Sequence, residues 1–251
     1  MFSDDTSAAV RPGDILTALA LLTRLPVRAD FSRGARAGWA YPLAGAVLAG
    51  LAALPTGAAL ALGLPSELAA LLFIATVVIL SGAMHEDGLS DAADGLWGGW
   101  DRARRLEIMK DSRIGAYGVI ALCLALAARW MAVGAVLAGD DWLGPLIAVA
   151  MLSRAAMPAL MAALPHARDS GLSHAQGRAD RGTALIAAAL AGLAALMLAG
   201  GTGVSLIIAT LLITAACGSI ARVKIGGQTG DILGATQQIA EIALLLILAA
   251  Q

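Results

Sequence analysis

The chain has 251 residues, of which 59% are apolar and 14% are charged. With its 29 glycines the apolar fraction reaches about 70%, well above the roughly 45–50% of a soluble domain. One buried core cannot hold this excess, so the composition predicts an integral membrane protein. The net charge of −1 provides no basic field for nucleic acid, and two cysteines in separate apolar runs exclude a disulfide scaffold and a zinc site.

Apolar runs of about 20 residues, the length that spans a bilayer, recur along the whole chain. We predict seven spans, at 38–57, 66–84, 117–138, 142–164, 183–200, 203–221 and 234–250. Residues 12–25, with Pro12 early and Asp14 in the first turn, predict a further helix at the membrane surface. The expected fold is an all-α polytopic bundle forming one domain over residues 1–251.

Basic residues alternate between the connections and predict the orientation. Lys and Arg occur in the stretches 11–36, 102–113, 168–181 and 222–224, whereas the connections 55–65, 139–141 and 200–203 have none. Seven spans with the N-terminus in the cytoplasm and the C-terminus outside satisfy this alternation.

Residues 85–115 hold 12 of the 35 charged residues. At roughly 2.5–3.5 kcal/mol per charge, burial of this window in lipid would cost on the order of 30 kcal/mol. We therefore expect the window at the membrane interface or along a wet cavity.

An acidic stripe lies inside this window. Asp87, Asp91 and Asp94 are spaced i, i+4 and i+7, so on a helix continuing the second span they share one face. Carboxylates that repel one another are typical of a Mg²⁺ or Mn²⁺ site, and such ions clamp a transferring phosphoryl group. The alternative is a solvated loop in which the carboxylates pair with the arginines at 102, 104 and 105.

Glu107 and Asp111 are also spaced i, i+4, and they would form the second half of a carboxylate cage. Asp91-x-x-Asp94-Gly followed by Glu107-x-x-x-Asp111 partly resembles the CDP-alcohol phosphotransferase signature. The chain departs from that signature at Gly98-Gly99, where Ala-Arg is expected, and at Glu107, which replaces an Asp.

A third cluster runs from Lys224 to Gly234 and reads KIGGQTGDILG. Backbone N–H groups of a glycine-rich turn before a helix bind phosphate, which makes Gly227, Gly230 and Asp231 candidate site residues. The alternative is an ordinary helix start with Asp231 in its first turn. No Gly-Lys-Ser/Thr occurs, so the turn is not a Walker P-loop.

Three charged residues lie well inside apolar spans, away from the span ends, where such residues indicate function by default. Arg129 and Arg154 lie near the middles of the third and fourth spans, and Glu241 lies in the last. We expect the arginines to face the bundle, where they either pair with carboxylates or contact a substrate phosphate.

Several motifs together resemble the cobalamin synthase family, in order along nearly the whole chain. They are Leu22-Thr-Arg-Leu-Pro26, His85-Glu-Asp-Gly-Leu-Ser-Asp-Ala-Ala-Asp-Gly95, Arg105-Leu-Glu-Ile-Met-Lys-Asp-Ser-Arg-Ile-Gly115, Pro165-x-x-Arg168 and Gly226-Gly-Gln-Thr-Gly-Asp231. Departures are small: Glu86 stands where Leu is frequent and Ser90 where Ala is usual.

The resemblance implies a Mg²⁺-dependent adenosylcobinamide-GDP ribazoletransferase. It would join α-ribazole or its 5′-phosphate to the cobinamide phosphate and release GMP, a late step of coenzyme B12 synthesis. The predicted metal ligands are Asp87, Asp91, Asp94, Glu107 and Asp111. The predicted catalytic residues are Asp91, Asp94 and Asp111, of which Asp94 or Asp111 is the expected base. The predicted substrate-binding residues are Lys110, Arg113, Arg154, Arg168, Lys224, Gly227, Gly230 and Asp231.

Two rival functions stay open at this point. A CDP-alcohol phosphotransferase would release CMP rather than GMP, and a secondary transporter would use the intramembrane charges. The family is prokaryotic, which implies an inner-membrane enzyme with its site facing the cytoplasm. The bilayer is the expected environment, and helices rich in small residues permit a homo-oligomer.

Overall fold

The computed structural model describes residues 10–251, and every regular element in this part of the chain is a helix. The long helices are α2 (Tyr41–Ala61), α3 (Ser66–Ser81), α4 (Met84–Gly98), α6 (Ala116–Leu137), α7 (Leu143–Ala163), α9 (Arg181–Leu198), α10 (Gly203–Ile225) and α11 (Gly230–Ala249). The short ones are α1 (Gly13–Leu22), η1 (Gly34–Ala40), α5 (Arg102–Ile108), α8 (Leu172–Gln176) and η2 (Gly200–Thr202).

The described residues contain six helices that are long and apolar enough to cross a membrane, and a bent pair brings the number to seven. The bent pair is α3 with α4, whose axes differ by 86°. The expected all-α membrane bundle with about seven spans is thus confirmed. The single domain over 1–251 stays a prediction, and its residues 1–9 lie outside the described part.

The acidic helix is not a continuation of the second span, and that prediction is wrong. The helix α3 ends at Ser81, and Gly82 and Ala83 have left-handed φ angles of 65° and 55° before α4 begins. A Cβ at Gly82 would lie 2.1 Å from Nε of Arg24, whose backbone N–H donates to the Leu80 carbonyl. The left-handed φ favours glycine at position 82, and the turn redirects α4.

The connection predicted from Pro55 to Pro65 is wrong in its first half. The helix α2 continues through Pro55 to Ala61. A proline inside a helix removes one hydrogen bond, and here the apolar sequence Gly57–Ala61 continues the helix beyond it.

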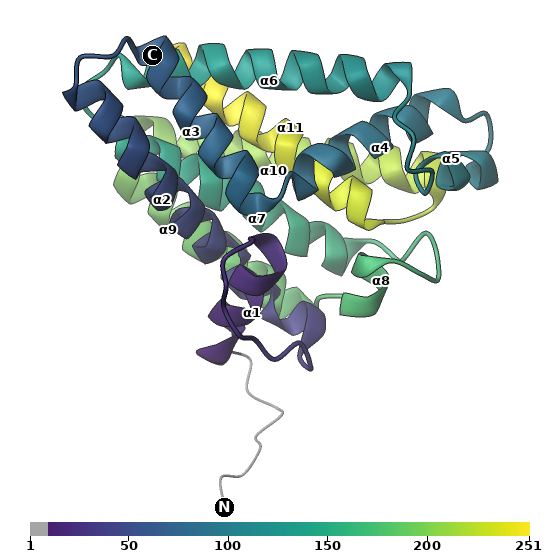
Figure 1. Ribbon diagram of the computed structural model, residues 1–251. Helices are drawn as coiled ribbons and strands as arrows, with labels where there is room; N and C mark the ends of the chain where they lie inside the picture. The colour runs from purple at the N-terminus through teal and green to yellow at the C-terminus, as the bar shows by residue number, and fades with distance from the viewer. Residues whose placement is uncertain (1–9) are drawn as a thin grey trace, which may run out of the picture.

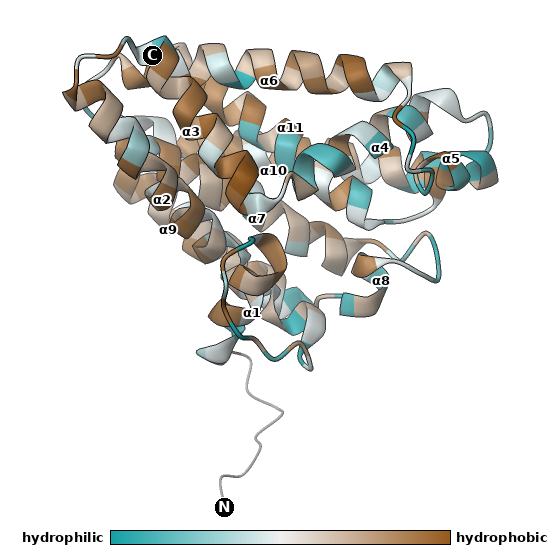
Figure 2. Cartoon of the chain, viewed as in Figure 1, coloured by the Kyte–Doolittle hydropathy of each residue, from teal (hydrophilic) through white to brown (hydrophobic). Residues whose placement is uncertain are grey.

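The helices spread from one corner of the molecule. In Figure 1 the α2–α3 connection and the C-terminus lie in the upper left corner. From there α6 and the α2–α9 pair diverge, and α1, α4, α5 and α8 occupy the opposite ends. Hydrophilic residues gather on α4, α5 and the middle of α11, whereas α2, α3 and α6 are mostly hydrophobic (Figure 2).

The helix α1 is held to the bundle by Asp14, which is buried. Its carboxylate accepts hydrogen bonds from Nε1 of Trp39 and Nε of Arg33, each at 2.7 Å. These bonds compensate the burial of the charge and fix α1 beside η1. The position of α1 at the membrane surface stays a prediction.

Candidate active site

Two glycines let α4 and α11 approach closely. A Cβ at Gly88 would lie 3.1 Å from the Asp231 carbonyl oxygen, and a Cβ at Gly234 would lie 3.3 Å from the His85 Cα. Larger residues at either position would push the helices apart. The close crossing places Asp87 and Asp91 of α4 near Asp231 in the first turn of α11, where the three carboxylates repel one another.

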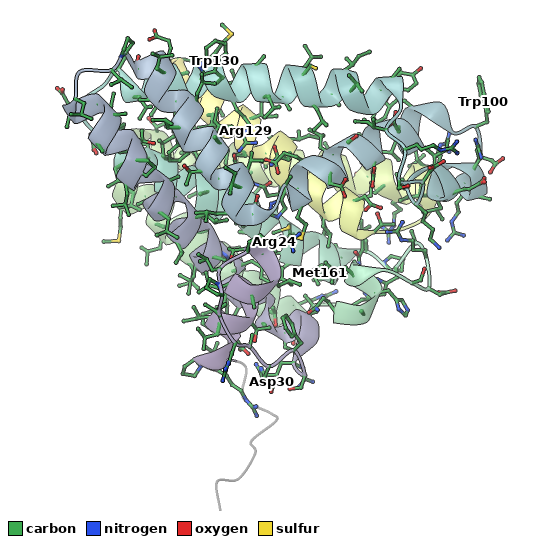
Figure 3. All side chains as sticks on the ribbon, viewed as in Figure 1. Arg24, Asp30, Trp100, Arg129, Trp130 and Met161 are labelled. Carbon is green, nitrogen blue, oxygen red and sulfur yellow. The ribbon has the colours of Figure 1, made fainter. Side chains whose placement is uncertain are left out.

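A hollow of about 230 Å³ opens beside this crossing, with contributions from α1, α2, α4, α7, α8 and α11. Its polar side carries Asp87, Asp231, Arg168 and His85. Its apolar side carries Leu21, Leu22, Tyr41, Met157, Met161, Leu172 and Leu233. Figure 3 shows Met161 in the space between α1 and α8. The site is therefore amphipathic, with charge at one wall and a broad apolar surface at the other.

The carboxylates of Asp87 and Asp91 accept no hydrogen bond and form no ion pair with any other residue in the range 10–251. Asp87 is exposed and Asp91 is half-buried. Like charges at this i, i+4 spacing destabilise the helix, and a bound cation would offset that repulsion. Carboxylate oxygens are ligands that Mg²⁺ prefers.

Arg168 contributes the positive charge of the hollow. Its Nη2 lies 3.1 Å from Oδ2 of Asp231, and its Nη1 is buried without any hydrogen-bond partner. Gly171, with a φ of 99°, packs beneath this guanidinium, and a Cβ there would lie 3.2 Å from Nη2. A buried guanidinium nitrogen without a partner is a costly arrangement unless a ligand oxygen completes it.

A family described as cobalamin-5-phosphate synthase matches residues 14–249. The chain belongs to that family.

Its curated relatives carry a consistent name, adenosylcobinamide-GDP ribazoletransferase. The protein of Bradyrhizobium diazoefficiens is 46% identical over 247 residues, which cover 94% of this chain and 93% of the relative. That of Mesorhizobium japonicum is 42% identical, with 93% and 92% covered, and that of Azorhizobium caulinodans is 43% identical, with 93% and 94% covered. No solved structure matches the chain. Family membership makes the chain a transferase of cobalamin synthesis and confirms the resemblance drawn from the motifs.

Asp94, a predicted ligand and base, caps a helix in this member of the family. Its Oδ2 accepts the Gly115 N–H at 2.7 Å and its Oδ1 accepts the Gly118 N–H at 2.9 Å. A Cβ at either glycine would overlap the Asp94 carboxylate. Asp94 therefore fixes the start of α6 against α4, and its metal-binding and catalytic roles stay predictions.

The predicted second half of the carboxylate cage, Glu107 and Asp111, lies in α5 and the loop after it, at the surface of the protein. Glu107 forms an ion pair with Arg104 at 2.8 Å, and Asp111 forms one with Arg113 at 2.6 Å. Hydrogen bonds from Arg113 lower the pKa of Asp111 to about 2. Neither carboxylate lines the hollow. Across residues 10–251 no group of three or more His, Cys, Asp or Glu side chains is arranged to hold a metal ion.

The predicted phosphate-binding residues are dispersed. Lys224 donates to the Leu96 carbonyl at 2.9 Å and lies 4.7 Å from the Trp97 ring centroid, and Lys110 is exposed. Among the predicted substrate-binding residues, those that line the hollow are Arg168, Gly230 and Asp231. The substrate contacts of the others stay predictions.

Gly227 is required for packing between two loops. A Cβ there would lie 2.2 Å from the Pro165 carbonyl oxygen. The Gln228 backbone N–H donates to the Pro165 carbonyl, and the Gln228 carbonyl accepts the Ala167 N–H. The Gln228 side chain forms hydrogen bonds with Ser173 and His166. This interlock sets Arg168 opposite Asp231. Sequence reasoning missed Ser173 and the role of Gln228, although Gln228 lies inside the quoted Gly226–Asp231 motif.

A buried polar network lies behind the hollow. Arg129 Nη1 is 2.7 Å from Glu86 and its Nη2 is 2.9 Å from Glu241, while Arg154 Nη1 is 3.6 Å from Glu241. Two guanidinium groups and two carboxylates balance in charge, which is the condition for burying them. Arg129 and Arg154 thus face the bundle and pair with carboxylates, one of the two arrangements expected from the sequence. A substrate contact by Arg154 stays a prediction.

Proposed function

We propose that the protein, at this hollow, transfers the phosphocobinamide moiety of adenosylcobinamide-GDP to α-ribazole or its 5′-phosphate and releases GMP. The observation that carries this proposal is the meeting of Arg168 Nη1, buried and without a partner, with the unpaired carboxylate of Asp87 at one apolar-walled hollow. A phosphate bearing a large, partly apolar ring system matches both walls. Family membership and the names of the relatives support the same reaction.

In this reaction the acceptor hydroxyl oxygen forms a bond to the phosphorus attached to cobinamide. The bond from that phosphorus to the oxygen of GMP breaks, and GMP leaves with the electron pair. The hydroxyl proton passes to a carboxylate. Of the three predicted catalytic acids, only Asp91 has a carboxylate without a hydrogen-bond or ion-pair partner within residues 10–251, whereas the carboxylates of Asp94 and Asp111 are engaged.

The donor set of the site fits Mg²⁺ by its chemistry. Asp87 and Asp91 would hold the ion through carboxylate oxygens, since Mg²⁺ commonly binds one or two carboxylates and completes its shell with substrate phosphates and water. A bound Mg²⁺ supplies neutralisation of the charge that develops on the departing phosphate.

The residues of the chain act by positioning. Arg168 donates from Nη1 to a phosphate oxygen of the donor substrate, while the ion pair between its Nη2 and Asp231 holds the guanidinium in place. The apolar side of the hollow, where Leu172 is 52% exposed, packs against the corrin ring and excludes water from that wall. A fixed cation beside the reacting phosphate stabilises its charge without reorganisation.

We further propose that the protein resides in a bacterial inner membrane with this site facing the cytoplasm. Two of the stretches that contain Lys and Arg, 11–36 and 168–181, contribute residues to the lining of the hollow, in accord with the positive-inside rule. The nucleotide product and both substrates then stay on one side of the membrane.

The test uses purified full-length protein in liposomes. The reaction contains adenosylcobinamide-GDP, α-ribazole or its 5′-phosphate, and Mg²⁺, with and without EDTA. We expect Mg²⁺-dependent release of GMP together with a new cobalamin, both separated by chromatography. Absence of product with both acceptors overturns the proposal, and release of CMP from CDP-alcohols favours the lipid enzyme instead.

A matched pair of variants tests the site separately from the reaction. Asp91→Asn should lower turnover by at least about 100-fold, the usual effect of removing one group that stabilises transition-state charge. Asp140→Asn, at an exposed position in the α6–α7 connection, should retain full turnover. Full turnover by Asp91→Asn would refute the site and leave the reaction standing.

A further inference from the structure

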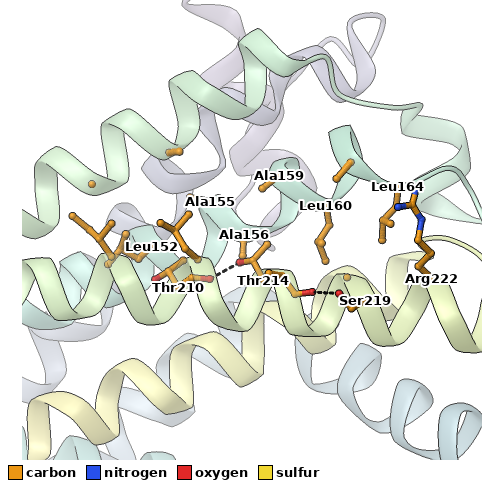
Figure 4. A pocket seen from close by; sticks show the side chains of 17 residues that line it. Leu152, Ala155, Ala156, Ala159, Leu160, Leu164, Thr210, Thr214, Ser219 and Arg222 are labelled. Atoms are coloured by element: carbon orange, nitrogen blue, oxygen red, sulfur yellow. Dashed lines mark hydrogen bonds between the residues drawn. The ribbon is translucent and has the colours of Figure 1, made fainter.

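A long groove runs between α7, α9 and α10, apart from the hollow. It has a volume of about 440 Å³, and its lining on α10 extends from Ile207 to Arg222. Small residues such as Ala156 and Ala159 of α7 and Ala188 of α9 form its surface. Figure 4 shows Leu152 toward one end of the groove and Arg222 at the other.

The interior of the groove offers no free polar group. Thr210, Thr214 and Ser219 line it, but each hydroxyl donates to the carbonyl four residues earlier in its own helix. The Thr214 and Ser219 bonds are drawn in Figure 4. These bonds satisfy the hydroxyls internally, so the groove suits a hydrocarbon rather than a polar solute.

One end of the groove is positively charged. Arg222 lines that end, and Arg178 lies beside it because its Nη2 donates to the Ala162 carbonyl at 2.9 Å, next to the lining residue Ala163. Both arginines are exposed, and neither has a carboxylate partner within residues 10–251. An anionic group above an apolar channel would complete this arrangement.

We propose that the groove binds one anionic phospholipid of the bilayer, with an acyl chain between α7, α9 and α10 and the phosphate at Arg222 and Arg178. The 15 helical steps from Ile207 to Arg222 span about 22 Å. One leaflet of the hydrocarbon region is about 15 Å thick. An acyl chain therefore fits along the groove while its phosphate stays at the charged end.

A second copy of the chain fits the groove less well. A helix 10–12 Å in diameter would displace on the order of 2,000 Å³ over the same length. That volume is about twice the empty space of about 1,090 Å³ within and above the groove. A single hydrocarbon chain is much thinner than a helix.

The test uses the full-length protein in phosphatidylcholine vesicles that contain a trace of photoactivatable lipid. The probe carries a diazirine on its acyl chain and either a phosphatidylglycerol or a phosphatidylcholine headgroup. We expect cross-links in the peptides 152–164 and 207–219, with phosphatidylglycerol exceeding phosphatidylcholine. Arg222→Gln should reduce the phosphatidylglycerol yield about five-fold, since one basic residue near the surface contributes about 1 kcal/mol.

Matched controls separate the chain site from the headgroup site. Ala188→Leu fills the groove and should suppress cross-linking of both probes, whereas Ala189→Leu, exposed on the same helix outside the groove, should not. Arg28→Gln, exposed in the α1–η1 connection, controls for Arg222→Gln.

Equal yields for both headgroups, or yields unaffected by Arg222→Gln and Ala188→Leu, overturn the proposal. So does a dimer, detected by native mass spectrometry, that Ala188→Leu dissociates. Arg222→Gln alters an exposed side chain and tests the headgroup even where Ala188→Leu misfolds.

Discussion

Replacing Arg168 with glutamine tests the chemistry of the hollow most directly. The guanidinium is only 15% exposed and its Asp231 partner 16%, so both charges are largely shielded from water. A hydrogen bond to a charged group in such a setting contributes about 1.5–3 kcal/mol. If Nη1 binds a substrate phosphate, Arg168→Gln should lower kcat/KM by about 10- to 150-fold. The GMP-release assay measures this directly.

A double-mutant cycle distinguishes phosphate binding from simple neutralisation of Asp231. If Arg168 serves only to balance that carboxylate, Asp231→Asn in the Arg168→Gln background removes the unbalanced charge and restores activity. Our interpretation predicts that the double variant stays as slow as Arg168→Gln or slower. The KM for adenosylcobinamide-GDP should rise while the KM for the ribazole acceptor stays constant. Restored activity, or equal changes in both KM values, would refute the assignment.

Three further predictions concern the network, the exposed loop and the orientation. Arg129→Gln should destabilise the protein by about 3–5 kcal/mol, because it leaves two buried carboxylates short of a partner, and an unchanged melting temperature in detergent would contradict this. The pKa of Asp111 is lowered to about 2, so its ion pair stabilises the folded loop above the usual value near 3.8 and that contribution is lost as pH falls toward 2. Carboxyl NMR should show Asp111 titrating near pH 2 and, in Arg113→Gln, in its usual range. In a cysteine-free background, Ala175→Cys should react with an impermeant maleimide only from the cytoplasmic side and Asp140→Cys only from the outside, and the reverse pattern would overturn the orientation.

Hydropathy predicted the membrane helices well because their length and apolar content are set by the bilayer itself. The predicted span 142–164 and the helix Leu143–Ala163 agree within one residue. The bend after the second span was not predictable in the same way. The turn contacts Arg24, 58 positions before Gly82 in the chain, and a hydropathy window contains no information on such contacts.

The candidate site was predictable only in part for the same reason. The spacing of Asp87 and Asp91 is a property of one helix, so a periodicity argument found their common face. The approach of Arg168 to Asp231 arises from interlocked loops around Gly227 and Gln228. Glycines in those loops indicate tight turns, but not which loop packs on which. The partners of Glu107 and Asp111 are also local arginines, an alternative that spacing alone could not exclude.

The buried network and the hollow lie against two different faces of the helix α4. In α4, His85 and Glu86 are buried, Glu86 against Arg129, whereas Asp87 one residue later is exposed toward the hollow. An isolated acidic helix would leave the apolar bundle, because several unpaired carboxylates are costly at the edge of a bilayer. The balanced pairing of Glu86 and Glu241 with two arginines holds α4 in the bundle at its N-terminal end, and the Asp94 contacts with Gly115 and Gly118 hold it further along. Asp87 and Asp91 are then free of structural partners because their neighbours fix the helix. This division explains why the network should govern stability and the hollow should govern turnover.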